Sequence, residues 1–179
     1  MKTCTIQNNT ISLNHSVIFT EKGIPLAEFA KKALKALRVE YAKFYKMDTL
    51  SKMAFLAAEV LLSPFSQEEK NGIALVFANR AASLDTDLKH QATIADEGEY
   101  YPSPAVFVYT LPNICLGEIS IRHQLKTENA FMVFDNYEQA EVFFKEYSRQ
   151  LIAEKSAEKV LCAWVEVLEN ECEVIATLY

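Results

Sequence analysis

A cysteine and a histidine that could form a catalytic pair lie close together in the stretch LPNICLGEISIRHQLKTEN, residues 111–129. Cys115 would be the nucleophile and His123 its base, which requires the thiol and the imidazole to lie within about 3 Å of each other. The apolar spacing predicts a helix over about residues 112–125, and eight residues of helix rise by about 12 Å. The two side chains therefore cannot form a dyad, and a packed core cysteine in the middle of a helix is the favoured interpretation.

The polar residues toward the end of the same helix have simple structural explanations. Arg122 and His123 lie near its C-terminus, where cations interact favourably with the helix dipole. Glu118 lies four residues before Arg122, so we expect the two to form an ion pair on the helix surface.

Other residues that could bind a metal or react with a substrate are scattered along the chain. No two cysteines have the C-x-x-C spacing and no two histidines the H-x-x-x-H spacing, so we expect reduced thiols and no zinc site. Four acidic residues could form a patch, but without a glycine-bearing loop they are better explained as charges at the start and on the surface of a helix. We expect no cofactor and no bound metal. The residues concerned are Cys4, Cys115, Cys162 and Cys172, then His15, His90 and His123, and finally Asp85, Asp87, Asp96 and Glu97.

The composition excludes several classes of protein. Half of the 179 residues are hydrophobic and 23% are charged, which is typical of a folded domain and not of a disordered chain. The formal net charge of −6 argues against binding to nucleic acid, which needs a clustered positive surface. No apolar run approaches the roughly 18 residues that span a membrane, and the N-terminus lacks the apolar core of a secretory signal. We expect a cytoplasmic protein with a single domain, residues 1–179.

Helical periodicity marks further segments with recognisable starts and ends. A helix begins after Pro25, and its apolar residues recur at helical spacing. Asp48 or Thr49 caps a second helix, which ends before Pro64. Residues 137–154 form an amphipathic helix.

Strands are expected between these helices. Residues 72–79 form a continuous apolar run, as expected of a central strand that is covered on both faces. Residues 129–135, 159–168 and 171–179 are the other strands, and the first twenty residues suggest a small hairpin or an edge strand. Strands that alternate with helices predict an α/β fold.

Three segments carry a resemblance to a known family. They are KMDTLSKMAFLAAEVLL, then AASLDTDLKHQATI after a strand, and finally PSPAVFVYTLPNICLGEISIRHQLKTENAFMVF. In order, over about residues 45–168, they resemble the N-terminal half of β-ketoacyl-acyl carrier protein synthases, the condensing enzymes of the thiolase fold. The most specific part is the pattern Leu-Pro-Asn, Gly-Glu-Ile and Ile-Arg between Leu111 and Arg122. The resemblance implies a layered thiolase-like half domain, with a mixed sheet flanked by helices, and the acyltransferase activity of a 3-oxoacyl-acyl carrier protein synthase.

The catalytic residues of the family are missing at the matching positions. In the family, a strand delivers the catalytic cysteine to a sharp turn at a helix N-terminus, about seven residues after a Gly-Pro-Asn-like turn. Residues 127–129 occupy that turn here, which places the nucleophile position at Asn136, and an amide cannot form a thioester. The second α/β half of the family, which supplies further catalytic residues, has no room before Tyr179.

The resemblance also implies an interface. In the family, the strand before the nucleophile pairs antiparallel with its mate across a two-fold axis. The matching residues here are Asn129, Phe131, Val133 and Asp135, which would lie at a homodimer or heterodimer seam. A half of this fold also leaves an apolar flank, which a partner, a second copy or the first 45 residues must cover.

These features predict a non-catalytic ketosynthase-like protein that is inactive alone. Its partner would be an active condensing enzyme or an acyl carrier protein in fatty acid or polyene/polyketide biosynthesis. Chain-length factors are a precedent in the family, since they resemble ketosynthases but carry glutamine in place of the cysteine. Two alternatives stay open: an acyl-thioester enzyme that uses another side chain such as Cys115, and a structural homodimeric remnant without acyl chemistry.

Overall fold

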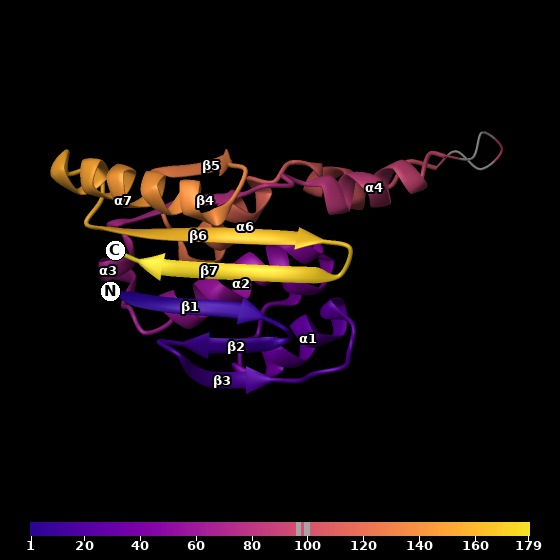
Figure 1. Ribbon diagram of the computed structural model, residues 1–179, viewed down its shortest axis with the longest axis horizontal. Helices are drawn as coiled ribbons and strands as arrows, with labels where there is room; N and C mark the ends of the chain where they lie inside the picture. The colour runs from indigo at the N-terminus through magenta and orange to yellow at the C-terminus, as the bar shows by residue number, and fades with distance from the viewer. Residues whose placement is uncertain (96–97, 99–100) are drawn as a thin grey trace.

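A seven-stranded mixed sheet forms the centre of the molecule, with helices on both of its faces (Figure 1). The computed structural model describes residues 1–95, 98 and 101–179. The strands are β1 Lys2–Gln7, β2 Thr10–Leu13, β3 Ser16–Thr20, β4 Ile73–Asn79, β5 Asn129–Val133, β6 Lys159–Leu168 and β7 Glu171–Leu178. Their order across the sheet is β3-β2-β1-β7-β6-β4-β5. The layered α/β fold expected from the sequence is confirmed.

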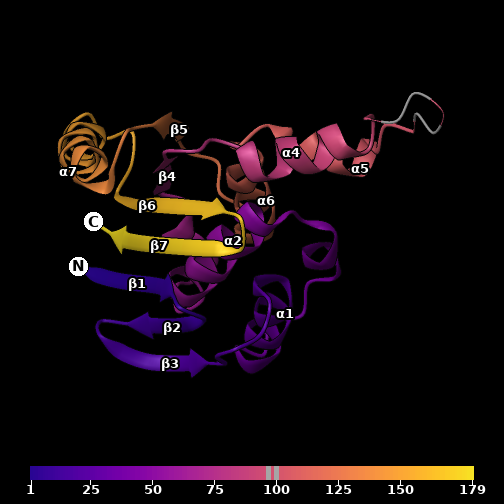
Figure 2. The same cartoon turned by 45° about the vertical axis from the view of Figure 1, so that its right-hand side comes forward.

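The helices form two unequal layers. They are α1 Leu26–Ala36, η1 Ala42–Lys46, α2 Thr49–Leu62, α3 Gln67–Lys70, α4 Leu84–Ala92, α5 Pro104–Phe107, η2 Val108–Thr110, α6 Ile114–His123 and α7 Tyr137–Ala153. Helices α1, α2 and α6 pack on one face of the sheet, whereas α7 packs on the other face over β4 and β6 (Figure 2). The short helices η1, α5 and η2 were not expected from the sequence.

Strand β4 is the central strand that the apolar run at residues 72–79 predicts. All of its residues are buried, because the α2 layer covers one face and α7 the other. It runs parallel to both neighbours, with Val76 opposite Ala130 of β5 and opposite Cys162 of β6. The carboxyl ends of these three strands therefore lie side by side, and there the chain leaves β4 toward α4 and β5 toward α7.

Helix α2 is the most deeply buried helix of the described chain. Thirteen of its fourteen residues are buried, because it lies between the sheet, α1 and α6. Its N-terminus is capped by Asp48, whose Oδ1 accepts a hydrogen bond from Ser51 N at 2.9 Å. This settles the two cap candidates in favour of Asp48, and the helix ends before Pro64 as expected.

Helix α7 has a different character, with a narrow buried stripe and a polar outer face. Only Ala140, Phe144, Ser148 and Leu151 are buried, at the spacing of one face of a helix. Most of its remaining side chains are exposed or half-buried, so α7 does not carry a broad apolar flank. On the other face of the sheet, the first 45 residues cover the helical layer, because α1 packs on α2.

The first twenty residues form three strands instead of a single hairpin. Strand β1 is not an edge strand, because it pairs antiparallel with β2 on one side and with β7 on the other. Lys2 lies opposite Leu178, so the two ends of the chain are side by side (Figure 1). Strand β3 is the outer strand at this end of the sheet.

Helices α4 and α5 project beyond the end of the sheet (Figures 1 and 2). Asp85 and Asp87 lie in the first turn of α4, as expected for helix-start charges. Asp96 and Glu97, the other half of the acidic patch considered above, lie outside the described residues. Within the described ranges, no single helix has the length and apolar character to cross a membrane, although the bent pair 104–110 and 114–123 passes that test jointly.

Candidate functional site

The junction between β5 and α7 holds Asn136, the residue that the sequence resemblance matches to a nucleophile position. Phe134 N donates to Asn79 O at 3.0 Å, which ties the end of β5 to the end of β4. Asn136 follows in an extended conformation, with φ −158° and ψ 168°, and its side-chain oxygen accepts a hydrogen bond from Gln139 N at 3.0 Å. The Asn136 side chain therefore caps α7, and its backbone lacks the strained geometry of a nucleophile turn.

The backbone donors that follow β4 are already occupied by a side chain of the protein. Glu166 on β6 accepts hydrogen bonds from Arg80 N at 2.7 Å and from Ala81 N at 3.3 Å. Asn79 closes the same turn, since its buried side chain accepts from Ala82 N and donates to Ala82 O. Backbone N–H groups of this kind stabilise the oxyanion of acyl-transfer chemistry, and here a carboxylate fills them.

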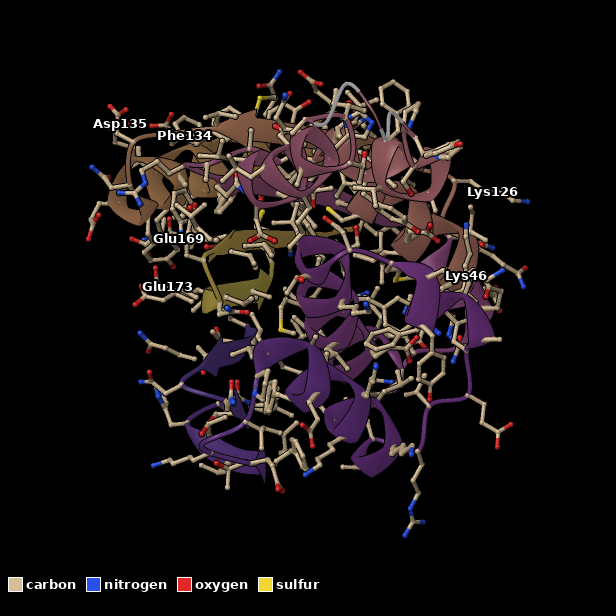
Figure 3. All side chains as sticks on the ribbon, turned by 90° about the vertical axis from the view of Figure 1, so that its right-hand side faces the viewer. Lys46, Lys126, Phe134, Asp135, Glu169 and Glu173 are labelled. Atoms are coloured by element: carbon tan, nitrogen blue, oxygen red, sulfur yellow. The ribbon has the colours of Figure 1, made fainter. Side chains whose placement is uncertain are left out.

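An acidic hollow of about 600 Å³ lies beside these groups. Glu166, Glu169, Glu171 and Glu173 line it together with Arg80. Figure 3 shows Glu169 and Glu173 on the same side of the molecule as Phe134 and Asp135, with Lys46 and Lys126 on the opposite side. An excess of carboxylates disfavours an anionic substrate at this edge of the sheet.

Strand β5 is the outer strand at the other end of the sheet. Among the described strands it pairs with β4 alone. Asn129, Val133 and Asp135 are exposed, with 58% of Val133 accessible, while Phe131 is half-buried against the main core. The outer row of backbone N–H and C=O groups can therefore accept a further strand. The seam at these four residues stays a prediction.

Cys115 is a buried core residue, although its position in the helix differs from the expectation. It is the second residue of α6 and not a mid-helix residue. A helix N-terminus by itself would favour the thiolate. Burial nevertheless raises the pKa of the Cys115 thiol, and the charge of Asp48 raises it further. The dyad with His123 is absent, because His123 contacts Glu59 instead.

Arg122 and His123 lie in the last turn of α6, as expected, but the helix dipole is not their main contact. Both contact Glu59 of α2, with Arg122 Nε at 2.7 Å and His123 Nε2 at 3.3 Å from Glu59 Oε1. Burial alone would raise the pKa of Glu59, but its interactions with Arg122 and His123 outweigh that effect and lower the pKa. The cluster joins α6 to α2. Glu59 is the sole acidic residue in the mainly apolar sequence of α2, and this isolated carboxylate is the feature of the sequence that could have indicated the cluster.

The predicted Glu118–Arg122 surface pair is wrong. Glu118 is buried, where its Oε1 accepts a hydrogen bond from Tyr109 OH at 3.0 Å and its Oε2 lies 2.8 Å from Lys43 Nζ. Burial raises the pKa of Tyr109, and the adjacent Glu118 raises it further. Lys43 and Tyr109 come from η1 and η2, so this cluster fixes two segments that sequence reasoning did not describe.

The other three thiols are also shielded by the fold. Burial raises the pKa of Cys4, Cys162 and Cys172 to about 12 each. Cys172 is half-buried and the other three cysteines are buried. Among the described residues, no group of three or more His, Cys, Asp or Glu side chains could hold a metal ion.

We expect all four cysteines of the native protein to react slowly with a thiol reagent at pH 7.5, with Cys115 the slowest. Burial limits access of the reagent to the thiols, and a raised pKa suppresses the thiolate that such reagents attack. The measurement is modification by a disulfide reagent followed by peptide mass spectrometry, with the unfolded protein as the fast control. Rapid and selective modification of one cysteine in the native protein would contradict the expectation and indicate an activated thiol.

The mixed sheet with its two helical layers is the fold of ketosynthase half-domains, and solved structures match it over almost the whole chain. The ishigamide ketosynthase/chain length factor matches with a TM-score of 0.69 and 15% identity, over 98% of this chain and 60% of the other. A ketosynthase (ApeO) in complex with its chain length factor (ApeC) from Xenorhabdus doucetiae matches with a TM-score of 0.61 and 14% identity, over 99% and 76%.

A third match is AntDE:AntF, a type II polyketide synthase acyl-carrier protein in complex with its ketosynthase bound to the hexaketide. Its TM-score is 0.61 at 14% identity, over 99% of this chain and 60% of the other. No family model and no curated protein matches the sequence. The chain is therefore structurally similar to type II polyketide ketosynthase and chain length factor chains at low sequence identity, and spans about 60% of two of them.

Proposed function

We propose that this protein is a non-catalytic ketosynthase-like partner of an active condensing enzyme in polyketide or fatty acid biosynthesis, and that it acts in the cytoplasm. One observation carries the proposal: the strand–helix junction that would hold the nucleophile holds Asn136, whose side chain caps α7. Glu166 supports it, because its carboxylate occupies backbone N–H groups at the same edge of the sheet. A fold kept without its catalytic groups is suited to binding a partner.

An acyl-thioester enzyme with a different nucleophile is less well supported. Each of the four thiols has a raised pKa because of burial, which opposes the thiolate that acyl transfer needs. The acidic hollow beside Glu166 would also repel an acidic substrate.

The contact with the partner is proposed to form at the outer edge of β5. Its open backbone edge can pair with a strand of the partner, and the exposed Val133 can pack across the seam. Two of the similar structures contain a ketosynthase in a complex, one with its chain length factor and one with an acyl-carrier protein, and a ketosynthase is the kind of partner proposed here. A second copy of the chain is the remaining alternative.

The Val133→Arg variant should lose association with the intact condensing enzyme of the same organism by at least about tenfold, because a charge would be buried at the seam. Val17→Arg is the matched control, since Val17 is 60% exposed and Val133 58%, but Val17 lies on β3 at the opposite edge of the sheet. The measurement is a binding isotherm with purified proteins, by surface plasmon resonance.

Activity provides a second readout of the same proposal. The protein alone should neither decarboxylate malonyl carrier protein nor transfer an acyl chain, and its addition should change the rate or product length of the intact enzyme. Turnover by the protein alone would overturn the non-catalytic proposal. Failure of the wild-type protein to bind any condensing enzyme, together with self-association that Val133→Arg abolishes, would favour the homodimer.

A further inference from the structure

A second, smaller cavity shares no lining residue with the acidic hollow. Its volume is about 270 Å³, and it lies where the end of η1, the start of α2, α4, α5 and η2 meet. Lys46, Lys52 and Lys89 line it together with a single carboxylate, that of Asp48. The cavity therefore carries an excess of positive charge, in a chain whose formal net charge is −6.

Lys52 is the unusual member of this group, because it is only 8% exposed. Its Nζ donates one hydrogen bond, to Met47 O at 2.6 Å, and an ammonium group has three N–H donors. Buried lysines normally have a paired carboxylate. Here the described carboxylate nearby, Asp48, already accepts hydrogen bonds from Ser51 N and from Thr86 Oγ1 at 2.8 Å.

The electrostatic surroundings of Lys52 are those of a cation without sufficient counter-charge. Burial lowers the pKa of Lys52, the charge of Asp48 acts in the opposite direction, and the charges of Lys31 and Lys89 lower the pKa further. Lys89 is itself paired with Asp85, whereas Lys46 is exposed at the cavity. A bound anion would supply the missing negative charge and accept the remaining N–H groups of Lys52.

We propose that this cavity binds a phosphate monoester, with Lys52 and Lys46 as the residues that hold the phosphate. A phosphate monoester carries a charge of about −1.5 to −2 at pH 7 and three acceptor oxygens, which match two ammonium groups better than a carboxylate does. The carbon part of the ester would lie against the apolar wall formed by Met47, Ala105 and Val106. The N-terminus of α2 is not part of the proposed site, because Asp48 already accepts the hydrogen bond from Ser51 N there.

The inference is independent of the proposed function, because it concerns the isolated chain and a different face. Glu169 and Glu173 of the acidic hollow lie on one side of the molecule with Asp135, whereas Lys46 lies on the other (Figure 3). Phosphate binding can therefore be present or absent whether or not the protein associates with a condensing enzyme.

The test is titration of the purified protein with phenyl phosphate and with inorganic phosphate, by calorimetry at constant ionic strength in chloride. Saturable binding of both is expected, with benzoate, which has the same ring and a single charge, at least about fivefold weaker. Lys52→Met should weaken phenyl phosphate binding at least about tenfold, and Lys46→Ala should weaken it by a smaller factor. Lys35→Ala, an exposed lysine of α1 outside the cavity, is the control and should bind as the wild type does.

Lys46→Ala keeps the test decisive if Lys52→Met fails to fold, because Lys46 is exposed and its removal leaves the core intact. Absence of saturable phosphate binding by the wild-type protein would overturn the proposal. Equal binding of benzoate and phenyl phosphate would overturn the assignment to phosphate. Affinity that is unchanged in Lys46→Ala and in a folded Lys52→Met variant would place the anion elsewhere.

Discussion

Phe55→Ala should lower the free energy of unfolding by about 3–5 kcal/mol, the cost of a large cavity in a core that cannot collapse around it. Phe55 has no exposed surface. Its ring stacks on Tyr41 at 5.2 Å between centroids and lies 5.4 Å from that of Phe44. The substitution therefore removes the contact that holds the α1–α2 connection to α2. Urea unfolding followed by circular dichroism measures the effect.

Tyr45→Ala is the control for this substitution. Tyr45 follows Phe44 in the short helix η1 but is 48% exposed, and its ring meets that of Phe44 edge to face at 6.1 Å. We expect a loss below about 1 kcal/mol, since little buried area disappears. Equal effects of the two substitutions would show that η1 does not pack on α2 as described.

Glu59→Gln should destabilise the protein by about 2–3 kcal/mol at pH 7. The substitution leaves Arg122 without its counter-charge and the buried His123 without its contact with a carboxylate, and removal of one partner from a buried ion pair costs about 3–5 kcal/mol. The expected loss of about 2–3 kcal/mol lies below that range because the side chain of Arg122 is 31% exposed, so water partly compensates its charge. Glu28→Gln, in an exposed ion pair with Lys32, is the control and should change stability by no more than about 0.5 kcal/mol.

The effect of Glu59→Gln should depend on pH in a defined direction. The pKa of Glu59 in the folded protein lies below its ordinary value of 4.5, so ionised Glu59 contributes stability above that value. The contribution is lost as the pH falls through the folded pKa, because the wild-type carboxylate then becomes protonated. Unfolding curves at pH 7, 5 and 3 should show the difference between wild type and variant shrinking with acidity. A constant difference would contradict the role of the Glu59 charge.

The elements with strong local patterns were predictable from the sequence. The apolar run of β4, the periodic segments of α2 and α7, and the two strands around Glu169 and Asn170 all appear where expected. These segments are set by the spacing of apolar residues and by caps, which are properties of neighbouring positions. The N-cap of α2 by Asp48 is of the same kind.

The ion pairs were not predictable in the same way. Spacing along one helix paired Glu118 with Arg122, but Glu118 binds Lys43 of η1 and Arg122 binds Glu59 of α2. Lys43 and Glu59, the true partners, are both far from α6 in the sequence, and Lys43 belongs to a segment without helical periodicity. Only the packing of η1 and α2 around α6 reveals these pairs. The Lys52 cavity was missed for the same reason, since it needs five elements in contact.

The pairing of β1 with β7 has a consequence for the order in which the protein can be assembled. Lys2 lies opposite Leu178 and Gln7 opposite Glu173, so β1 is synthesised long before β7, its second neighbour in the sheet. Contacts at this sequence separation slow folding. Until β7 emerges, the nascent β1–β2–β3 segment carries an open edge, which makes it the part of the growing chain most exposed to mispairing and to chaperone binding.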